Sequence, residues 1–130
     1  MWPAPFFAAT MLAAAAGAFA WSFARRISRY EVAGESMEPA LASGDWLLVD
    51  RGAYSRRLPR PGHVVLACDP RAPDREIVKR VVHVDIHDAA WLEGDNPELS
   101  SDSRVFGTVP RRLLLGRVRW RYWPRPGIVR

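Results

Sequence analysis

The chain has 130 residues, about one domain, and its 19 Lys and Arg residues against 14 Asp and Glu residues give a formal net charge of +5. Two large domains are therefore excluded, and a hydrophobic content of 48% excludes a disordered chain. The lone cysteine, Cys68, excludes an internal disulfide, and the sequence has no cysteine cluster that could hold a structural zinc ion.

The N-terminal part of the chain is apolar, since residues 1–24 contain no Asp, Glu, Lys or Arg. As a helix, residues 4–24 would be roughly 31 Å long, close to the hydrocarbon thickness of a bilayer. We predict one N-terminal transmembrane helix that is retained as an anchor. Two alternatives stay open: residues 18–20 (Ala-Phe-Ala) are similar to the end of a cleaved signal peptide, and the helix could be buried in a soluble domain.

Basic residues follow this segment directly, at Arg25, Arg26 and Arg29. The positive-inside rule then predicts a single-pass membrane protein with its C-terminal domain on the cytoplasmic face. We divide the chain into residues 1–29, the membrane anchor with its basic flank, and residues 30–130, a β-rich domain.

From Tyr30 onward, short apolar runs alternate with turn residues, and no helical period extends over ten residues. The sequence predicts a mainly β fold, a small barrel or sandwich. The expected strands are Tyr30–Ala33, Trp46–Asp50, His63–Cys68, Glu76–Ile86, Ala90–Glu93 and Leu113–Trp123. Turn residues stand between them, including those of residues 69–74 and 94–97.

The C-terminal part is basic, because every charged residue after Asp102 is an arginine. Aromatic residues lie among these arginines at Trp120, Tyr122 and Trp123. This pattern is typical of an edge strand with solvated arginines or of contact with a membrane surface. Stacking on nucleic acid is a third, weaker reading, and we expect no nucleic acid partner.

Lys79 is the only lysine in a chain that otherwise uses arginine. A guanidinium stays protonated, whereas burial can lower the pKa of an ammonium group enough for it to act as a base. A strand over residues 76–82 would place Ile77 and Val81 on the same face as Lys79 and so desolvate its amine. The alternative is an ordinary lysine on a strand surface.

Ser36 is the candidate nucleophile. It lies in a predicted turn between Gly34 and Pro39, where its hydroxyl can project and its own N–H can face a developing oxyanion. Taken alone, a serine at such a position is more often a helix cap or a turn residue. The case for chemistry therefore depends on Ser36 and Lys79 together.

Four segments, in order, resemble the conserved boxes of type I signal peptidases. Residues 34–41 (Gly-Glu-Ser-Met-Glu-Pro-Ala-Leu), continued by residues 43–49, are similar to the serine box of that family. The others are residues 60–65 (Arg-Pro-Gly-His-Val-Val), residues 78–82 (Val-Lys-Arg-Val-Val) and residues 94–104, which begin Gly-Asp-Asn and end Ser-Asp-Ser-Arg. One box alone would be a weak signal, but four in order are a strong one.

The resemblance implies a Ser/Lys dyad and an acyl-enzyme intermediate, with Ser36 as nucleophile and neutral Lys79 as general base. It also implies that Ser100 orients the lysine amine and that Asp102 and Arg104 form a structural ion pair beside the site. No cofactor or metal is expected.

The chain departs from the family pattern at three places. Gly34 stands where some members have a hydroxyl side chain in the oxyanion hole, so the N–H of Ser36 is the expected main donor. His63 replaces the usual Asp, and residues 83–88 (His-Val-Asp-Ile-His-Asp) replace a glycine- and proline-containing stretch. A metal site at the two histidines of that stretch is disfavoured, since in an extended segment they would lie roughly 13 Å apart.

The short chain and its ending, residues 115–124, most resemble the branch of the family that matures nickel-type superoxide dismutase by removing its N-terminal propeptide. We therefore expect this precursor as substrate, which agrees with a domain on the cytoplasmic face. The alternative is a general signal peptidase that cleaves secretory preproteins, with its domain on the extracytoplasmic face. A second alternative is a catalytically inactive, membrane-bound binding module with the same fold.

Overall fold

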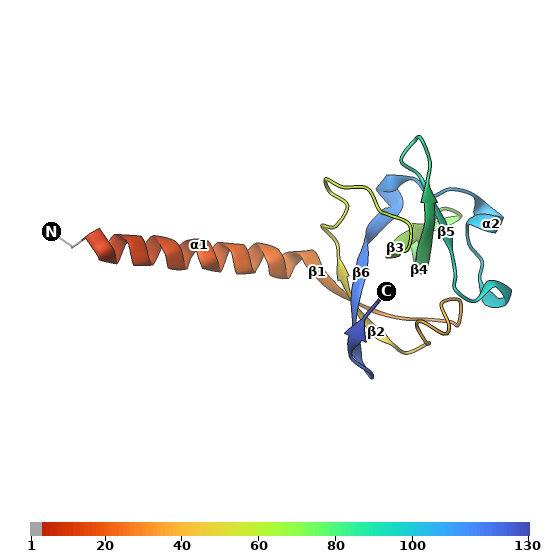
Figure 1. Cartoon of the computed structure of the whole chain (residues 1–130), viewed down its shortest axis with the longest axis horizontal. Helices are drawn as coiled ribbons and strands as arrows, with labels where there is room; N and C mark the ends of the chain where they lie inside the picture. Colours follow the sequence, from red (N-terminus) through yellow and green to blue (C-terminus); the bar gives the residue numbers. More distant parts are fainter. Residues whose placement is uncertain (1–3) are drawn as a thin grey trace.

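The computed structural model describes residues 4–130, which form one long helix followed by a β domain (Figure 1). Helix α1 spans Ala4–Arg26. The strands are β1 (Ile27–Glu31), β2 (Trp46–Asp50), β3 (Val64–Asp69), β4 (Ala72–Val84), β5 (Ala90–Glu93), β6 (Leu114–Trp123) and β7 (Gly127–Ile128). A short helix, α2 (Ser103–Phe106), and two 3-10 turns, Pro97–Leu99 and Arg111–Leu113, lie between strands of the C-terminal half.

Helix α1 is long and apolar enough to cross a membrane. Residues Pro5–Arg26 have a mean hydropathy of 1.6, and none of this segment is buried by the rest of the protein. Figure 1 shows the helix extending away from the β domain. The predicted apolar helix is confirmed, and the alternative of a helix buried in a soluble domain is wrong, because the β domain leaves it uncovered.

The helix passes into the β domain without a linker, since β1 begins at the residue after α1 ends. The Arg51 N–H donates to the Arg26 carbonyl at 2.7 Å, and the Arg26 guanidinium lies 3.4 Å from the Asp50 carboxylate. These contacts attach the end of the helix to the end of β2.

All seven strands of residues 4–130 belong to one antiparallel sheet with the order β1-β2-β6-β3-β4-β5, and β7 pairs with β6. This confirms the mainly β fold predicted from the alternation of apolar runs and turns.

The central strand β3 is buried on both faces of the sheet. Val64 and Leu66 belong to one hydrophobic cluster, whereas Val65 and Ala67 belong to another. Side chains alternate between the faces of a strand, so the continuous apolar run of β3 serves both clusters.

The observed strands correct several predicted boundaries. Trp46–Asp50 and Ala90–Glu93 are β2 and β5 as expected, and the expected Leu113–Trp123 starts one residue later as β6. The expected Tyr30–Ala33 is instead Ile27–Glu31, because these residues pair one for one with β2.

In the middle of the sheet, His63–Cys68 is shifted by one residue to become β3, and Glu76–Ile86 is replaced by Ala72–Val84 as β4. The second strand starts early because its first residues turn back onto β3. Cys68 pairs with Glu76 and Asp69 with Ala72, so residues 73–75 form a bulge in which Pro73 needs no ladder partner.

Candidate active site

The loop that carries Ser36 connects β1 to β2 and is anchored in the core. Met37 and Leu41 are each 1% exposed and pack in the same cluster as β2 and β3. Gly34 has a φ of +82°, a backbone conformation that side chains with a Cβ rarely adopt. The buried Met37 thus fixes the loop directly beside Ser36, which is itself half-buried.

Polar contacts fix the same loop from two further sides. The Asp45 carboxylate accepts hydrogen bonds from the Ala42 N–H at 2.9 Å and from Arg121 of β6 at 3.3 Å. The Asn96 N–H donates to the Ser36 carbonyl at 2.9 Å, which joins the serine loop to the segment after β5. The position of Ser36 is therefore set by packing and by hydrogen bonds from outside the loop.

Lys79 lies in the middle of β4 and is 4% exposed. Its neighbours Ile77 and Val81 are buried in the second hydrophobic cluster, as the alternation of strand residues predicts. The reading of Lys79 as an ordinary surface lysine is therefore wrong.

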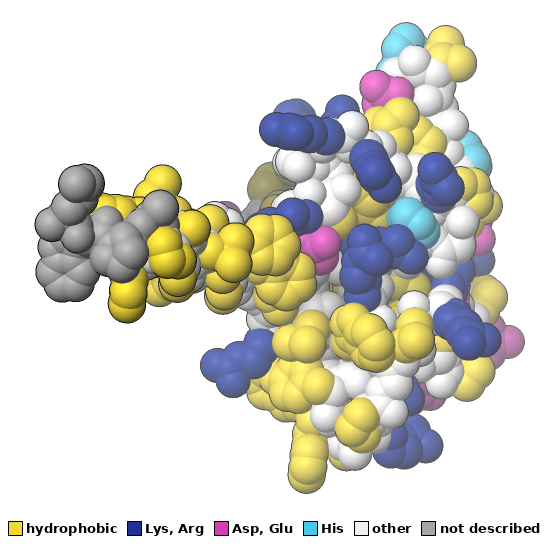
Figure 2. Space-filling model, turned by 60° about the vertical axis from the view of Figure 1, so that its left-hand side comes forward, with side chains coloured by type: hydrophobic (Ala, Val, Ile, Leu, Met, Phe, Trp, Pro, Cys, Tyr) yellow, Lys and Arg dark blue, Asp and Glu magenta, His cyan; other side chains and the backbone are white. Residues whose placement is uncertain are grey.

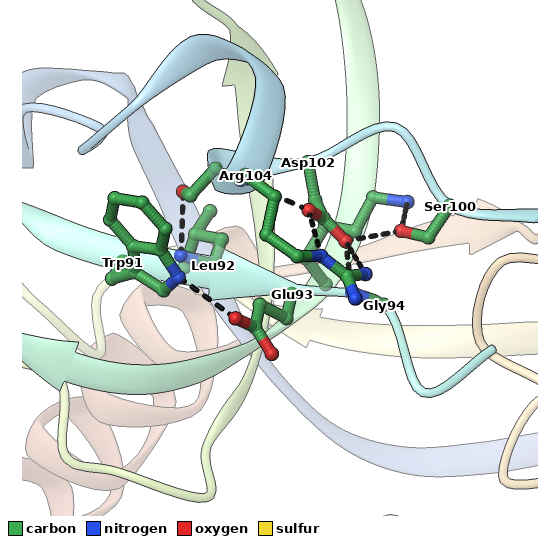
Figure 3. Close-up of polar contacts among 9 residues, drawn as sticks. Trp91, Leu92, Glu93, Gly94, Ser100, Asp102 and Arg104 are labelled. Carbon is green, nitrogen blue, oxygen red and sulfur yellow. Dashed lines mark hydrogen bonds and ion pairs between the residues drawn. The ribbon is translucent and has the colours of Figure 1, made fainter. Parts of the chain in front are cut away.

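A chain of hydrogen bonds runs from Lys79 to Arg104. The Lys79 Nζ donates to Ser100 Oγ at 3.1 Å, and Ser100 Oγ donates to Asp102 Oδ2 at 2.6 Å. Arg104 binds both carboxylate oxygens of Asp102, at 2.9 Å and 2.6 Å. Figure 3 shows the Asp102 carboxylate between Ser100 and Arg104, with Gly94 beside it.

The direction of this chain is set by Asp102, which is fully buried. Burial alone would raise the pKa of Asp102, but hydrogen bonds from Arg104, Ser100 and the Gly94 N–H outweigh it and hold the pKa well below its ordinary range. An ionised carboxylate only accepts hydrogen bonds, so the hydroxyl proton of Ser100 is committed to Asp102. The Ser100 oxygen is then left to accept from Lys79.

The pKa of the Lys79 amine is lowered, mainly because burial disfavours the ammonium form. The negative charge of Asp102 acts in the opposite direction, while Arg75 and Arg104 add to the lowering. The side chain is thus shifted toward the neutral amine, the form that can accept a proton.

Ser36 and Lys79 line the same pocket, which has a volume of about 210 Å³. Its apolar wall includes Val32, Ile77 and Val78. Within residues 4–130, no hydrogen bond joins Ser36 Oγ to Lys79 Nζ, and the Ser36 N–H donates to no protein acceptor. Among the described residues, the hydroxyl and the N–H of Ser36 therefore have no partner and are free to interact with a bound substrate.

At Gly94 the backbone passes close to both the loop of Ser36 and the side chain of Ser100. A Cβ there would lie 2.2 Å from Ser100 Oγ and 2.5 Å from the Ser36 carbonyl oxygen. Glycine allows the segment after β5 to pass between the serine loop and the lysine-binding serine.

The structure also places residues that the sequence did not single out. Tyr30, Arg75 and Glu76 line the pocket at the side of β1 and β4, and their spacing in the sequence carries no signal for this. Within the Gly-Asp-Asn motif that pointed to this region, Asp95 forms an ion pair with Arg80 at 2.7 Å, a pairing that the motif alone did not indicate. In the described part of the chain, no group of three or more His, Cys, Asp or Glu residues could hold a metal ion.

Comparison with known proteins places the chain among proteases. The family model described as signal peptidase, peptidase S26, matches residues 4–85 and 86–123. The mitochondrial inner membrane protease subunit 1 of Xenopus tropicalis is 33% identical over an alignment of 110 positions, which covers 70% of this chain and 66% of that protein.

Two further relatives agree. The mitochondrial ATP-independent inner membrane protease subunit 1b of Arabidopsis thaliana is 34% identical over an alignment of 113 positions, which covers 70% of this chain and 67% of that protein. The signal peptidase I of Aquifex aeolicus is 36% identical over 53 residues, 41% of this chain and 21% of that protein. The chain spans about two thirds of the length of the two mitochondrial relatives.

The match to this family model identifies the class as a signal-peptidase-type serine endopeptidase, and the antiparallel β domain behind one apolar helix agrees with that class. The chain belongs to the peptidase S26 signal peptidase family.

Proposed function

We propose that the protein is an endopeptidase that removes N-terminal presequences from precursor proteins, with Ser36 as nucleophile and Lys79 as general base. One observation carries this proposal above the others. The only lysine of the chain is buried, is bound by Ser100 and lines the same pocket as Ser36.

The first chemical step is attack of Ser36 Oγ on the scissile carbonyl carbon while Lys79 takes the hydroxyl proton. The neutral amine can do this because it donates to Ser100 and keeps its lone pair for Ser36. The tetrahedral intermediate then collapses, the leaving amine takes the proton from Lys79, and an ester joins Ser36 to the acyl group. Water, deprotonated by Lys79, hydrolyses this ester and restores the serine.

The oxyanion of the intermediate needs a hydrogen-bond donor beside Ser36. The backbone N–H of Ser36 is suited to this role because it donates to no acceptor within the described residues. Gly34 has no side chain to supply a second donor, so the Ser36 N–H is the main donor in this proposal.

Ser100, Asp102 and Arg104 act in this scheme as positioning residues. Asp102 orients the Ser100 hydroxyl, Ser100 in turn holds the amine, and Arg104 balances the buried charge of Asp102. Replacing Lys79 by Arg would keep a cation but remove the base, so we expect no proteolysis by the folded Lys79→Arg variant.

The substrate we favour is a precursor protein at the membrane that carries an N-terminal presequence or signal peptide. The relatives support this choice, because they are named as inner membrane proteases and as a signal peptidase. The propeptide of nickel-type superoxide dismutase, expected from the compact ending of the sequence, gains no support from them. It stays as a second candidate only because Arg25, Arg26 and Arg29 favour a domain on the cytoplasmic face.

The test incubates purified protein with a secretory preprotein and, separately, with a propeptide-bearing nickel superoxide dismutase, and the new N-termini are read by mass spectrometry. Cleavage of the preprotein that is lost in Ser36→Ala supports the proposal. Cleavage of the dismutase alone would favour the second candidate, and failure to cleave either would favour a binding module of the same fold.

A reporter fused after Arg130 tests the orientation of the domain. An extracytoplasmic signal agrees with the general peptidase, and a cytoplasmic signal agrees with the dismutase protease.

A further inference from the structure

A second pocket lies away from Ser36 and Lys79, on the other side of β3. Its volume is about 520 Å³, and its polar lining residues are Tyr54, Arg57, Arg60, His63, Arg117 and Arg119. Among the described residues that line it, none is acidic. The pocket therefore concentrates positive charge in a concave site.

Most of these arginines have no protein partner for their charge. In residues 4–130, the guanidinium groups of Arg57, Arg60 and Arg117 form no hydrogen bond or ion pair, and that of Arg119 lies only 3.9 Å from the Asp50 carboxylate. Figure 2 shows Lys and Arg side chains grouped around a histidine on the face of the β domain beside the helix. Like charges gathered without counter-ions favour an anionic ligand.

The floor of the pocket offers a neutral donor as well. His63 Nδ1 lies 2.9 Å from the Tyr54 hydroxyl and accepts from the Arg60 N–H at 3.3 Å. Burial, followed by the charges of Arg117, Arg119 and Arg60, lowers the pKa of His63 and favours the neutral ring. Because Nδ1 accepts, the neutral ring carries its proton on Nε2, where it can donate to an anion.

The pocket is next to the end of the membrane helix. Arg57 and Arg119 also line a neighbouring cavity together with Arg26, the last residue of α1. Arg119 lines a third, more apolar cavity with Phe23 and Ile27. In Figure 1 the segment between β2 and β3 lies on the side of the domain that α1 enters. With α1 in a bilayer, this pocket faces the headgroup layer.

We propose that the pocket formed by Arg57, Arg60, His63 and Arg117 binds the phosphate headgroup of an anionic phospholipid in the membrane that α1 enters. Guanidinium groups match the planar, multidentate geometry of a phosphate. The acyl chains of such a lipid would extend toward Phe23 and Trp120, at the apolar cavity beside the helix. This binding site is independent of the proposed proteolysis, since it contains neither Ser36 nor Lys79.

The test is native mass spectrometry of the full-length protein in micelles that hold equal amounts of phosphatidylglycerol and phosphatidylcholine. We expect the wild type to retain phosphatidylglycerol in preference to phosphatidylcholine. In Arg57→Gln/Arg60→Gln this preference falls roughly 30-fold, since each arginine near an anionic headgroup contributes a factor of about five. Both side chains are exposed and form no hydrogen bond or ion pair within residues 4–130, and the backbone contacts of Arg60 with His63 are kept in the variant, so the fold is retained.

The matched control is Arg125→Gln/Arg130→Gln, which removes the same charge at exposed side chains that line neither this pocket nor its two neighbours. Its lipid preference stays at the wild-type value, as does that of Ser36→Ala. An equal loss in the control would mean a bulk charge effect and overturn the proposal. Tighter binding of inorganic phosphate, measured in phosphatidylcholine alone, would instead make this a free-phosphate site. Displacement of the lipid by a short single-stranded oligonucleotide would make it a nucleic acid site.

Discussion

The Ser100 hydroxyl offers the sharpest test of the proposed dyad. In Ser100→Ala, Lys79 Nζ loses its acceptor at 3.1 Å and Asp102 loses the shortest of its neutral hydrogen bonds, at 2.6 Å. A hydrogen bond to a charged group contributes about 1.5–3 kcal/mol. If the bond to Lys79 serves the transition state, this loss lowers kcat by about 10- to 100-fold.

The same substitution separates positioning from binding. Ser100 is not among the residues that line the Ser36 pocket, whereas its neighbour Ser101 is. We therefore expect KM to change less than about twofold in Ser100→Ala, and kcat to stay within about twofold in Ser101→Ala. Asp102 keeps its bonds from Gly94 and Arg104, so the variant stays folded at a cost of about 1–2 kcal/mol.

The assay is steady-state cleavage of an internally quenched presequence peptide, with thermal unfolding measured on the same preparations. Ser100→Thr retains a hydroxyl and should recover most of kcat, which distinguishes lost positioning from a damaged fold. A kcat within about threefold of the wild type in Ser100→Ala would refute the idea that Ser100 orients the base.

Three further outcomes are expected. The value of kcat/KM should rise with pH along a single limb whose pKa is below 10.5, because only the neutral form of Lys79 accepts the proton; a limb at or above 10.5 contradicts this. Gly94→Ala should abolish cleavage, since the new methyl group would lie 2.2 Å from Ser100 Oγ, while Gly17→Ala, which meets nothing within 4 Å, should leave the same peptide assay unchanged. Folding lowers the pKa of Lys79, so between the folded-state pKa and 10.5 the Lys79 amine is protonated in the unfolded chain but neutral in the folded one. The free energy of unfolding therefore rises with pH up to 10.5, by at most about 1.4 kcal/mol per pH unit. Thermal unfolding of Lys79→Met should lack this rise and show a higher Tm at neutral pH; a Tm unchanged at every pH would contradict the burial argument.

The sequence predicts those parts of the fold in which local patterns and tertiary structure agree. The apolar helix and strands β2 and β5 are bounded by strong turn residues or by charge, and their limits are nearly those expected. β1 and β4 are displaced because strand pairing determined their limits. Five residues of β1 pair with β2 although Ser28 and Arg29 have no apolar pattern, and the early start of β4 depends on a bulge opposite β3.

In the candidate site too, some residues can be predicted from local sequence patterns and others depend on tertiary contacts. The one lysine, the serine turn and the Gly-Asp-Asn motif can be found along the chain because each is an unusual residue choice for its position. The pocket walls from Tyr30, Arg75 and Glu76 could not be found in this way. They line the pocket with Ser36 because β1 and β4 meet there, where the Tyr30 hydroxyl donates to the Glu76 carbonyl at 3.3 Å. Contact between strands that are distant in the sequence leaves no mark on local spacing.

The direct junction between α1 and β1 fixes the distance between the end of the membrane helix and the Ser36 pocket. β1 has five residues and is a paired strand of the sheet, so it extends roughly 17 Å from the last residue of the helix to the edge of the Ser36 pocket. Within the described residues, no loop separates α1 from β1. The height of the nucleophile above the bilayer is therefore set by the sheet, and a precursor held in that bilayer is cut only if its scissile bond reaches the same level. The proposed enzyme would then select precursors by the distance of the scissile bond from the bilayer as well as by the sequence around that bond.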